Sequence, residues 1–486
     1  MKPSKIKQNI QQALFEKLVG IDTVISVTIV GSFINHEDLT GISDIDTIVI
    51  CNSLDKKLFD DCLNAARNLD LDMCGLDNYT LKINHSFGPL KFDKPNLAVL
   101  HLMIYDINSH RRHVLASPFT CFDWEKSEIR VGPSLKEIFP AGKLQFRDFT
   151  EVRRSLENYI DDLENKVISY REYDFKVDEV VEIKKNKPLD KRHQGEYSYH
   201  IVRNIIANYL KLFNNKNESY SNNEIRTEIK RLFYESGDAH IKMFDMISKI
   251  KHQREDSFPE HTMKWVKTFL IDFQQKISME WSEAVPVHFL RHYKTNLNNG
   301  SYLGQGRDPD IDKSITAYPR YESTTMVYSS PMRRCLKTAA EIWKDSKIMT
   351  DDRLLEFDYG RAEAMHYDQL VTQYPEISTG WQKGEDPCFP EGENTADVFG
   401  RLTSFLDDLS NVIDNQHPDS ISIVTHNGLL RCLLGNAFGL DQKDWYKLVI
   451  SHGVQLDFLY WRNCFYPNIP RQLWGDILQN IGYLES

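Results

Sequence analysis

Hydrophobic and polar positions change their pattern twice along the chain. The first part, residues 1–115, opens with apolar residues at helical spacing and continues with short apolar runs rich in Val and Ile. Runs of that length between helical segments are typical of strands that pair into a mixed sheet with helices packed on it. The runs are VISVTIV (24–30), DIDTIVI (44–50) and NLAVLHLMIYD (96–106). We therefore predict an α+β domain over residues 1–115.

The second and third parts differ in the period of their apolar residues. Residues 116–283 carry them at helical spacing among many charged residues, which predicts a mostly helical domain. The charged stretch KKNKPLDKRHQGE (184–196) interrupts this pattern and is expected to form a loop. Residues 284–486 alternate strand-like and helix-like segments, which predicts an α/β domain with a largely parallel sheet. Its main strand candidates are VPVHFL, TTMVYSS and SISIVTH.

The composition narrows the class of protein. The 486 residues are 41% hydrophobic and 27% charged, as in globular proteins, and their formal net charge is -11. The acidic balance argues against a general nucleic-acid-binding role, while the basic residues of 184–196 leave a local one open. The chain shows neither an apolar run of membrane-spanning length nor a signal-peptide pattern. Eight scattered cysteines without a CxxC pair fit a reducing compartment, so we expect a cytoplasmic protein without membrane contact.

Charged residues directly follow the predicted strands of the third part. Arg291 and His292 come after the first strand, Arg334 follows the second, and His426 ends the third. The carboxyl ends of parallel strands are where open α/β sheets bind ligands. A histidine nitrogen can accept a phosphoryl group covalently, and the arginine fork matches phosphate oxygens and stays charged. These residues therefore indicate phosphoryl transfer with a histidine nucleophile.

Five motifs stand in order across residues 288–431. They read FLRHYKTNLNNG, SSPMRRCLKTA, LLEFDYGRAEA, FPEGENTADVF and IVTHNGLLRCLL. In this order they resemble the histidine phosphatase superfamily, which includes the cofactor-dependent phosphoglycerate mutases and whose first motif is Arg-His-Gly. The resemblance implies a three-layer α/β fold, a small phosphorylated substrate, and no required cofactor for this domain.

The resemblance also implies a role for each matching residue. It makes His292 the phosphate-accepting nucleophile, Glu356 the proton donor to the leaving group, and His426 the second active-site histidine. The residues that it places on the phosphate are Arg291, Arg334 and, near a further phosphate-binding position, Asn298.

Four positions depart from the family pattern. Tyr293 stands where a glycine usually follows the nucleophile, and Lys294 replaces a common acidic or amide residue. Thr425 and Asn427 flank His426 where Ser and Gly are common. A bulky Tyr293 is expected to reshape the pocket wall and narrow the substrate range, or else to mark a degenerate enzyme. The intact set of charged residues favours activity.

A second group of polar residues lies in the first part of the chain. Gly31 and Ser32 follow the first apolar run, and Asp44 and Asp46 open the second. Alternate strand residues face the same side, so the two carboxylates project together and repel each other unless a cation lies between them. Mg²⁺ uses such a pair together with substrate phosphates, which a Gly-Ser pair can approach closely. The pattern predicts a site for Mg²⁺ and a triphosphate.

A Gly-Ser pair, a spacer and an Asp-x-Asp on a strand resemble the nucleotidyltransferase superfamily related to DNA polymerase beta. The resemblance implies metal roles for Asp44 and Asp46, NTP contact through Gly31 and Ser32, and a substrate-binding role for the helical region 116–283.

Many members of that superfamily carry a third carboxylate on a later strand. The expected slot in this chain lies closest to His101, and Asp106 and Asp93 are the other options. A one-metal or altered site is therefore as open as a two-metal site.

Three interpretations of the whole chain follow. The leading one is a bifunctional enzyme, with Mg²⁺-dependent nucleotidyl transfer from an NTP in the N-terminal half and phosphate-ester hydrolysis through His292. The second keeps the phosphatase and makes the first domain a non-catalytic nucleotide sensor. The third is a nucleotidyltransferase acting on RNA or protein, with the phosphatase in an editing role. A mutase is the alternative to a phosphatase, and the departures around 293–299 favour the phosphatase.

Overall fold

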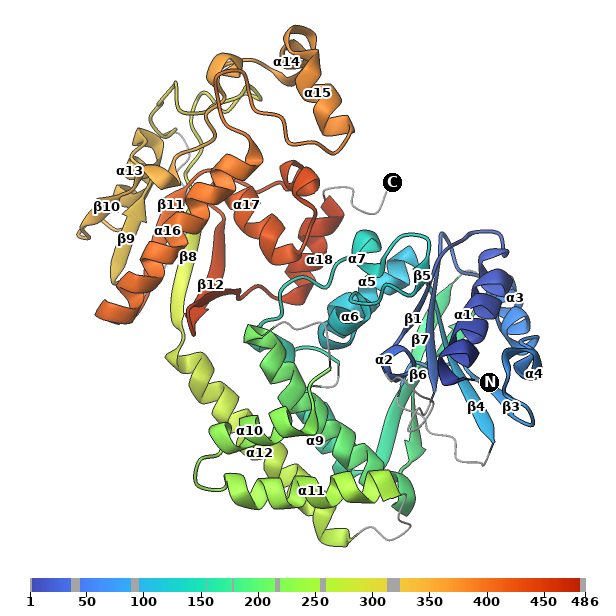
Figure 1. Cartoon of the computed structure of the whole chain (residues 1–486). Helices are drawn as coiled ribbons and strands as arrows, with labels where there is room; N and C mark the ends of the chain where they lie inside the picture. Colours follow the sequence, from blue (N-terminus) through green and yellow to red (C-terminus); the bar gives the residue numbers. More distant parts are fainter. Residues whose placement is uncertain are drawn as a thin grey trace. The chain divides into compact units, whose positions relative to one another are not determined.

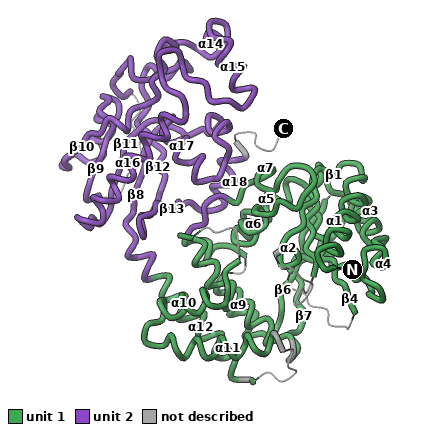
Figure 2. Tube along the Cα trace, viewed as in Figure 1, with its two compact units in different colours: residues 1–141, 146–278 green, residues 142–145, 279–486 purple. Residues whose placement is uncertain are grey.

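The structure, a computed structural model, describes residues 2–35, 44–88, 96–153, 155–176, 179–214, 219–253, 259–312 and 324–480. Its contacts divide the chain into two compact units, which Figure 2 shows in separate colours. Unit 1 comprises residues 1–141 and 146–278, and unit 2 comprises residues 142–145 and 279–486. No helix among the described residues is long and apolar enough to cross a membrane.

A five-stranded mixed sheet forms the N-terminal part of unit 1 (Figure 1). Its order is β3-β4-β2-β1-β5, with β1 antiparallel to β2 and β5, and β4 parallel to β2 and β3. The three apolar runs of the sequence form β1, β2 and β4, as predicted. The strands are β1 (Val24–Val30), β2 (Ile45–Cys51), β3 (Thr80–Asn84), β4 (Leu97–Asp106) and β5 (Arg130–Val131).

Helices make up most of the rest of unit 1, with one antiparallel hairpin between α8 and α9. The hairpin strands are β6 (Val167–Phe175) and β7 (Val180–Pro188). The helices are α1 (Pro3–Val19), α2 (Ser32–Asn35), α3 (Lys56–Arg67), α4 (Leu71–Cys74), α5 (Ile107–Ala116), α6 (Pro118–Trp124), α7 (Leu135–Ile138), the 3-10 helix η1 (Phe146–Phe149), α8 (Leu156–Glu164), α9 (Lys191–Phe213), α10 (Asn222–Leu232), α11 (Gly237–Gln253) and α12 (Glu260–Glu283).

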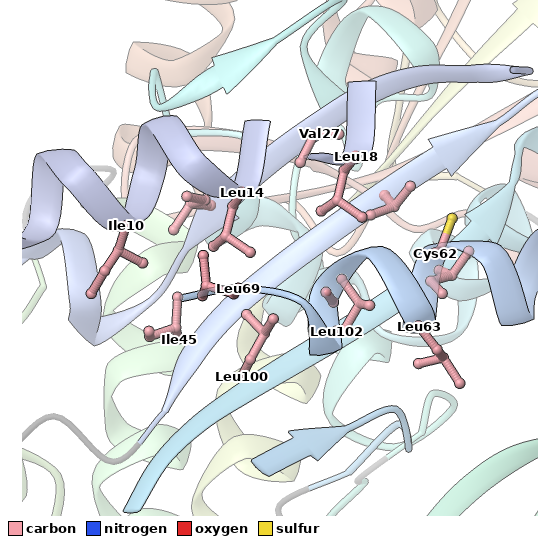
Figure 3. Close-up of a cluster of buried hydrophobic side chains, with 14 of the residues drawn as sticks. Ile10, Leu14, Leu18, Val27, Ile45, Cys62, Leu63, Leu69, Leu100 and Leu102 are labelled. Carbon is pink, nitrogen blue, oxygen red and sulfur yellow. The ribbon is translucent and has the colours of Figure 1, made fainter. Parts of the chain in front are cut away.

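Both faces of the five-stranded sheet are covered by apolar side chains, because strand residues alternate between the faces. On one face, residues of α1 and α3 such as Leu14 and Cys62 pack on Leu102 of β4, as Figure 3 shows. The other face carries a smaller cluster that includes Ile48 of β2. Asp46 lies two residues before Ile48, so its carboxylate shares this second face.

The charged stretch at 184–196 is not the loop that its composition suggested. Residues 184–188 belong to β7, and α9 begins at Lys191. The side chain of Asp190 accepts the backbone N–H of His193 at 2.9 Å, which caps the helix. This end of β7 is exposed, so its charged side chains stay in water while the backbone pairs with β6.

A six-stranded sheet forms the centre of unit 2, in the order β10-β9-β11-β8-β12-β13. The four strands β8 to β11 run parallel, and β12 pairs antiparallel with β8 and β13. The elements are β8 (Val285–Arg291), β9 (Met326–Ser329), α13 (Arg333–Ile342), β10 (Ile348–Thr350), η2 (Asp352–Leu354), η3 (Gly360–Ala362), α14 (Tyr367–Gln373), α15 (Pro375–Gln382), α16 (Thr395–Gln416), β11 (Ile421–Thr425), α17 (Asn427–Phe438), η4 (Gln442–Lys447), β12 (Gln455–Trp461), β13 (Cys464–Pro467) and α18 (Arg471–Asn480).

Helices cover this sheet on both faces, which confirms an α/β domain. Val327 of β9 packs with Cys335 and Ala339 of α13. The next strand residue, Tyr328, points the other way, and its ring contacts that of Phe405 on α16, with the centroids 5.6 Å apart. The sheet therefore lies between α13 and α16, in the three-layer arrangement that the motifs implied.

The predicted domain boundaries after residues 115 and 283 are not the boundaries of the two units. β5 pairs with β1, so residues beyond 115 complete the N-terminal sheet. The units divide within α12, at residues 278 and 279. Most of the residues in the first two predicted domains thus belong to unit 1.

A four-residue segment, residues 142–145, belongs to unit 2 although its flanks belong to unit 1. The buried side chain of Gln145 binds the backbone of Ile469 twice: Nε2 donates to the carbonyl at 2.9 Å, and Oε1 accepts the N–H at 3.0 Å. The N–H of Lys143 also donates to the carbonyl of Ala437 at 2.8 Å. These bonds pair backbone groups that would otherwise be buried without partners.

We expect Gln145→Leu to lower the free energy of unfolding of unit 2 by about 2 to 4 kcal/mol, because two buried backbone groups of Ile469 lose their partners. Urea titration with pulsed hydrogen exchange of peptides from α18 measures the change. Gln416→Leu, at an exposed position at the end of α16, is the matched control. Equal stability of the two variants would contradict the prediction.

Candidate functional site

Two histidines meet at the carboxyl ends of neighbouring strands in unit 2. Arg291 ends β8, His292 follows it, and His426 follows β11. Because β8 and β11 are parallel neighbours, the backbone N–H of His292 donates to the carbonyl of Thr425 at 3.0 Å. The ring centroids of His292 and His426 lie 5.2 Å apart. The structure thus brings together three residues that the sequence placed at strand ends.

His292 is held in one protonation form. Its Nδ1 lies 2.7 Å from the carbonyl oxygen of Tyr293, which can only accept, so Nδ1 carries the proton and Nε2 keeps its lone pair. Burial lowers the pKa of His292 well below its ordinary value, and the positive charges of Arg334 and Arg291 lower it further. The ring is therefore neutral near pH 7, with Nε2 available as a nucleophile.

Arg334 is fully buried, and its guanidinium binds several groups of the site. Nη1 donates to the carbonyl of Arg307 at 3.0 Å, and Nη2 donates to that of Gly304 at 2.9 Å. Nε donates to Nδ1 of His426 at 3.2 Å, and a carboxylate oxygen of Asp308 lies 3.7 Å from Nη1. A buried cation with paired donors can face an anion without rearranging.

His426 takes the tautomer opposite to that of His292. Its Nδ1 accepts from Arg334, so its proton lies on Nε2, which donates to Oγ of Ser330 at 2.8 Å. Burial and the charge of Arg334 hold the pKa of His426 well below its ordinary value. The ring therefore offers a neutral N–H donor next to His292.

Arg291 belongs to the same cationic site. Its Nη1 donates to the carbonyl of Ile450, while its buried Nε has no hydrogen-bond partner among the described residues. Burial lowers the pKa of Arg291 to about 10, and the negative charge of Glu356 acts in the opposite direction. Arg291 stays charged at neutral pH.

The side chain of Glu356 is buried and lies against the first turn of α17. Its Oε1 accepts the backbone N–H of Gly428 at 2.9 Å and that of Phe357 at 3.0 Å. A Cβ at position 428 would overlap this oxygen, so glycine is required there, while position 427 accepts Asn. Glu356 thus lies beside the helix that His426 precedes.

Two residues near the nucleophile have structural partners. Tyr293 is buried, and its backbone N–H donates to Oγ1 of Thr338 at 2.9 Å, so the bulky side chain fits within the packed interior. Oδ1 of Asn298 accepts the N–H and the hydroxyl of Thr295 at 2.8 and 2.9 Å. Asn298 thus closes a turn, and its predicted contact with phosphate stays a prediction.

A third histidine, His452, was missed in the sequence. Its ring centroid lies 5.3 Å from that of His292. It lies in the loop before β12 and belongs to none of the five motifs. Its place beside His292 follows from the pairing of β12 with β8, which the motifs do not reveal. Burial and the charges of Arg291 and Lys294 lower its pKa to about 4.

The predicted metal site lies in unit 1, where three acidic or imidazole groups meet. Ligand atoms of Asp44, Asp46 and His101 lie within 4.8 Å of one another. Asp46 and His101 are opposite each other on the parallel strands β2 and β4. The slot expected for a third carboxylate therefore holds a histidine.

His101 binds two acceptors. Its Nδ1 lies 2.8 Å from Oδ1 of Asp46, and its Nε2 lies 2.7 Å from the carbonyl oxygen of Ser86. Burial alone would lower the pKa of His101, but the hydrogen bond and charge of Asp46 outweigh it, and the pKa is raised. The acceptor at each nitrogen fixes the orientation of the ring, and the charge of Asp46 favours its protonated form.

Gly31 packs directly on this group. Its neighbour Val30 pairs with Asp46 across β1 and β2, and its φ is 79°. A Cβ at position 31 would lie 2.5 Å from Oδ2 of Asp46, so a larger residue would displace the carboxylate. Ser32 begins the short helix α2 next to it.

Asp106, another option for a third carboxylate, is not in this group. Asp106 lies at the far end of β4 and caps α5, where its side chain accepts the N–H of Ser109 at 2.6 Å. Asp93 lies outside the described residues. Two carboxylates with an oriented partner fit one Mg²⁺, whereas imidazole is a poor ligand for that ion.

The pKa of His452 makes the stability of unit 2 depend on pH. A histidine whose pKa falls from 6.5 to about 4 on folding binds fewer protons folded than unfolded, so stability is lost as the pH drops below about 6.5. The free energy of unfolding of the wild type should fall between pH 7 and pH 5. We expect that fall to be about 1 to 2 kcal/mol smaller in His452→Asn. Urea titrations at both pH values, with pulsed hydrogen exchange of β8 and β11 peptides, measure this; identical losses in both proteins would contradict it.

Comparison with known proteins places this site in a family. Residues 287–463 match the sequence profile of the histidine phosphatase superfamily, branch 1. Phosphoserine phosphatase 1 of Hydrogenobacter thermophilus is 29% identical over 175 residues, which cover 33% of this chain and 80% of that protein. Adenosylcobalamin/alpha-ribazole phosphatase of Escherichia coli is 24% identical over 174 residues, which cover 34% and 84%.

Solved structures match over a slightly larger share of the chain. A phosphoserine phosphatase mutant from Entamoeba histolytica, in complex with phosphoserine, is 18% identical with a TM-score of 0.33, over 38% of this chain and 95% of that one. The matched profile lies within unit 2 and contains all five motifs and both strand-end histidines. The C-terminal region of this chain, residues 287–463, is a histidine phosphatase domain.

Proposed function

We propose that the C-terminal domain hydrolyses small phosphate monoesters through a covalent phosphohistidine at Nε2 of His292. The observation that carries the proposal is the bond from Nδ1 of His292 to the carbonyl of Tyr293, which leaves Nε2 with its lone pair beside two arginines. A neutral imidazole among cations suits attack on an anionic phosphoryl group, because the charge that the group brings is balanced on arrival.

The proposed reaction has two displacements. Nε2 of His292 attacks phosphorus, the P–N bond forms, and the ester P–O bond breaks as Glu356 gives a proton to the leaving oxygen. Water then attacks the phosphorus, its P–O bond forms as the P–N bond breaks, and Glu356 takes a proton from the water, which releases inorganic phosphate and restores neutral His292. Oε1 of Glu356 already accepts two backbone N–H groups, which leaves Oε2 to handle the proton. Arg291 and Arg334 would stabilise the phosphoryl oxygens, and His426 would join them by turning its Nε2–H from Ser330 to the phosphate.

The substrate class that we propose is a small phosphorylated metabolite such as phosphoserine. Relatives of this region carry phosphatase names, among them one for phosphoserine and one for alpha-ribazole. Hydrolysis is preferred to a mutase reaction because Tyr293 and Lys294 depart from the motif that the mutases share.

We expect His292→Asn to abolish hydrolysis of p-nitrophenyl phosphate and phosphoserine, because an amide side chain has no nitrogen lone pair able to attack phosphorus. Rapid quenching of the wild type with excess substrate is expected to trap one phosphoryl group on Nε2 of His292, which peptide mass spectrometry locates.

The matched control is His417→Asn, at an exposed position that keeps a residue tolerant of its φ of 48°. This variant should retain full activity. Wild-type activity in His292→Asn, or turnover without any phosphate on position 292, would contradict the proposed mechanism.

We further propose that unit 1 binds an NTP with Mg²⁺ held by Asp44 and Asp46, and transfers its nucleotidyl group. Support comes from the closeness of the two carboxylates and the packing of Gly31 on Asp46. Bound Mg²⁺ would neutralise the triphosphate and withdraw charge from the bond that breaks. The residues of the chain would hold the ion and, through Gly31 and Ser32, approach the phosphates.

A nucleotide sensor is the second candidate for this unit. His101 stands where a third carboxylate would hold a second ion, and its charge balances that of Asp46. A site with two carboxylates and an imidazolium keeps one cation-binding pair and lacks the second. Nucleotide binding without chemistry is compatible with that arrangement.

We expect Asp44→Asn and Asp46→Asn each to weaken Mg²⁺-dependent NTP binding by tenfold or more, because each removes half of the charge that binds the ion. Isothermal titration with a panel of NTPs, with and without Mg²⁺, measures the effect. Hydrolysis of p-nitrophenyl phosphate by unit 2 should not change in either variant.

Asp72→Asn, at an exposed position of α4, is the control. Mg²⁺-dependent binding that is equal in the wild type and both variants would remove the proposal. Release of pyrophosphate in the presence of acceptor substrates separates the transferase from the sensor, which would bind without releasing it.

A further inference from the structure

Two nitrogen atoms at the phosphatase site are without a hydrogen-bond partner in the part of the chain that the structure describes. Nε of Arg291 and Nε2 of His452 are both shielded from water and make no hydrogen bond among the described residues. A buried donor without a partner costs about 1 to 3 kcal/mol, so such groups are rare unless a ligand completes them. Both lie beside the nucleophile, since Arg291 precedes His292 and the ring of His452 lies 5.3 Å from that of His292.

The loop that carries His452 is fixed to the end of β8. The backbone N–H of Arg291 donates to the carbonyl of Val454 at 3.1 Å, and the N–H of Gly453 donates to the carbonyl of Arg291 at 3.0 Å. The guanidinium of Arg291 donates to the carbonyl of Ile450. These three bonds hold the backbone on both sides of His452, so its ring is placed beside His292 before any ligand binds.

The surroundings of His452 carry positive charge. Arg291 on β8 and Lys294 in the following loop both act on the ring, and their charge together with burial keeps it neutral. A neutral imidazole can place its proton on Nε2 and donate it. An anion is the ligand that would satisfy this donor and also meet the field of the two cations.

We propose that His452 is a third histidine of the phosphate site, whose Nε2–H donates to an oxygen of the same phosphoryl group that accepts from Nε of Arg291. The proposal rests on the phosphatase function proposed for this domain. It assigns to His452 a contact with the phosphoryl group itself, not with the rest of the substrate.

The test uses the full-length protein and ligands that have no leaving group. Inorganic phosphate and orthovanadate are titrated as competitive inhibitors of p-nitrophenyl phosphate hydrolysis. His452→Phe keeps a ring of similar size without a donor, and His452→Gln keeps a donor without the ring. We expect His452→Phe to raise the inhibition constants of both anions about tenfold to a hundredfold, which is the effect of losing one charge-assisted hydrogen bond. His452→Gln should recover part of the affinity.

The readouts separate contact with phosphate from a structural role. His452→Phe should still form phospho-His292 under saturating substrate, because the nucleophile and both arginines are unchanged. Protection from hydrogen exchange in β8 and β11 should match that of the control His417→Asn. Inhibition constants in His452→Phe equal to those of the wild type would overturn the assignment, as would a loss of affinity that His452→Gln does not recover while protection is intact.

Failure of the proposed phosphatase function gives a different result. In that case the wild type itself shows neither turnover nor phospho-His292. Phosphate and vanadate binding is then measured directly by isothermal titration. The assignment of His452 stands if His452→Phe weakens that binding tenfold or more, and it is overturned if the two proteins bind equally.

Discussion

A fully buried arginine sets the architecture of the phosphatase site. Removing a guanidinium from water is costly unless its donors find acceptors, and Arg334 finds them in the carbonyls of Gly304 and Arg307 and in the ring of His426. Meeting that requirement brings the loop after β8 to α13 and fixes the tautomer of His426. The positions of the loop, the helix and the second histidine thus depend on one buried charge.

The same requirement explains why the site suits an anion. Arg291 and Arg334 lie close enough to His292 to lower its pKa. Asp308 lies 3.7 Å from Arg334 and offsets part of this positive charge. Because their pKa values are lowered, His292 and His426 stay neutral and add no further positive charge. A phosphoryl group would bring the missing negative charge to donors that are already in place. Such preorganisation is the main source of stabilisation that enzymes offer to transferred phosphoryl groups.

Sequence alone predicted the parts of this structure that follow strand periodicity. His292 and His426 end apolar runs, so their meeting at one sheet edge follows from parallel pairing, and the slot of His101 follows from its register opposite Asp46. His452 could not be found in this way, because its position depends on an antiparallel edge strand and a loop outside the motifs. Gln145 was equally hidden, since its partner Ile469 is far along the chain.

The candidate sites of the two units carry clustered charges of opposite sign. In unit 1, two carboxylates lie together, and the charge of Asp46 raises the pKa of His101, which binds that carboxylate. In unit 2, burial and the charges of Arg291 and Arg334 keep the histidines neutral, so an arriving phosphate meets two cations, with Asp308 as a nearby counter-charge. The net charge of -11 therefore describes neither site. At each site, charges within a few ångströms dominate the electrostatic potential that a ligand meets. Burial strengthens these nearby charges relative to the net charge of the whole surface.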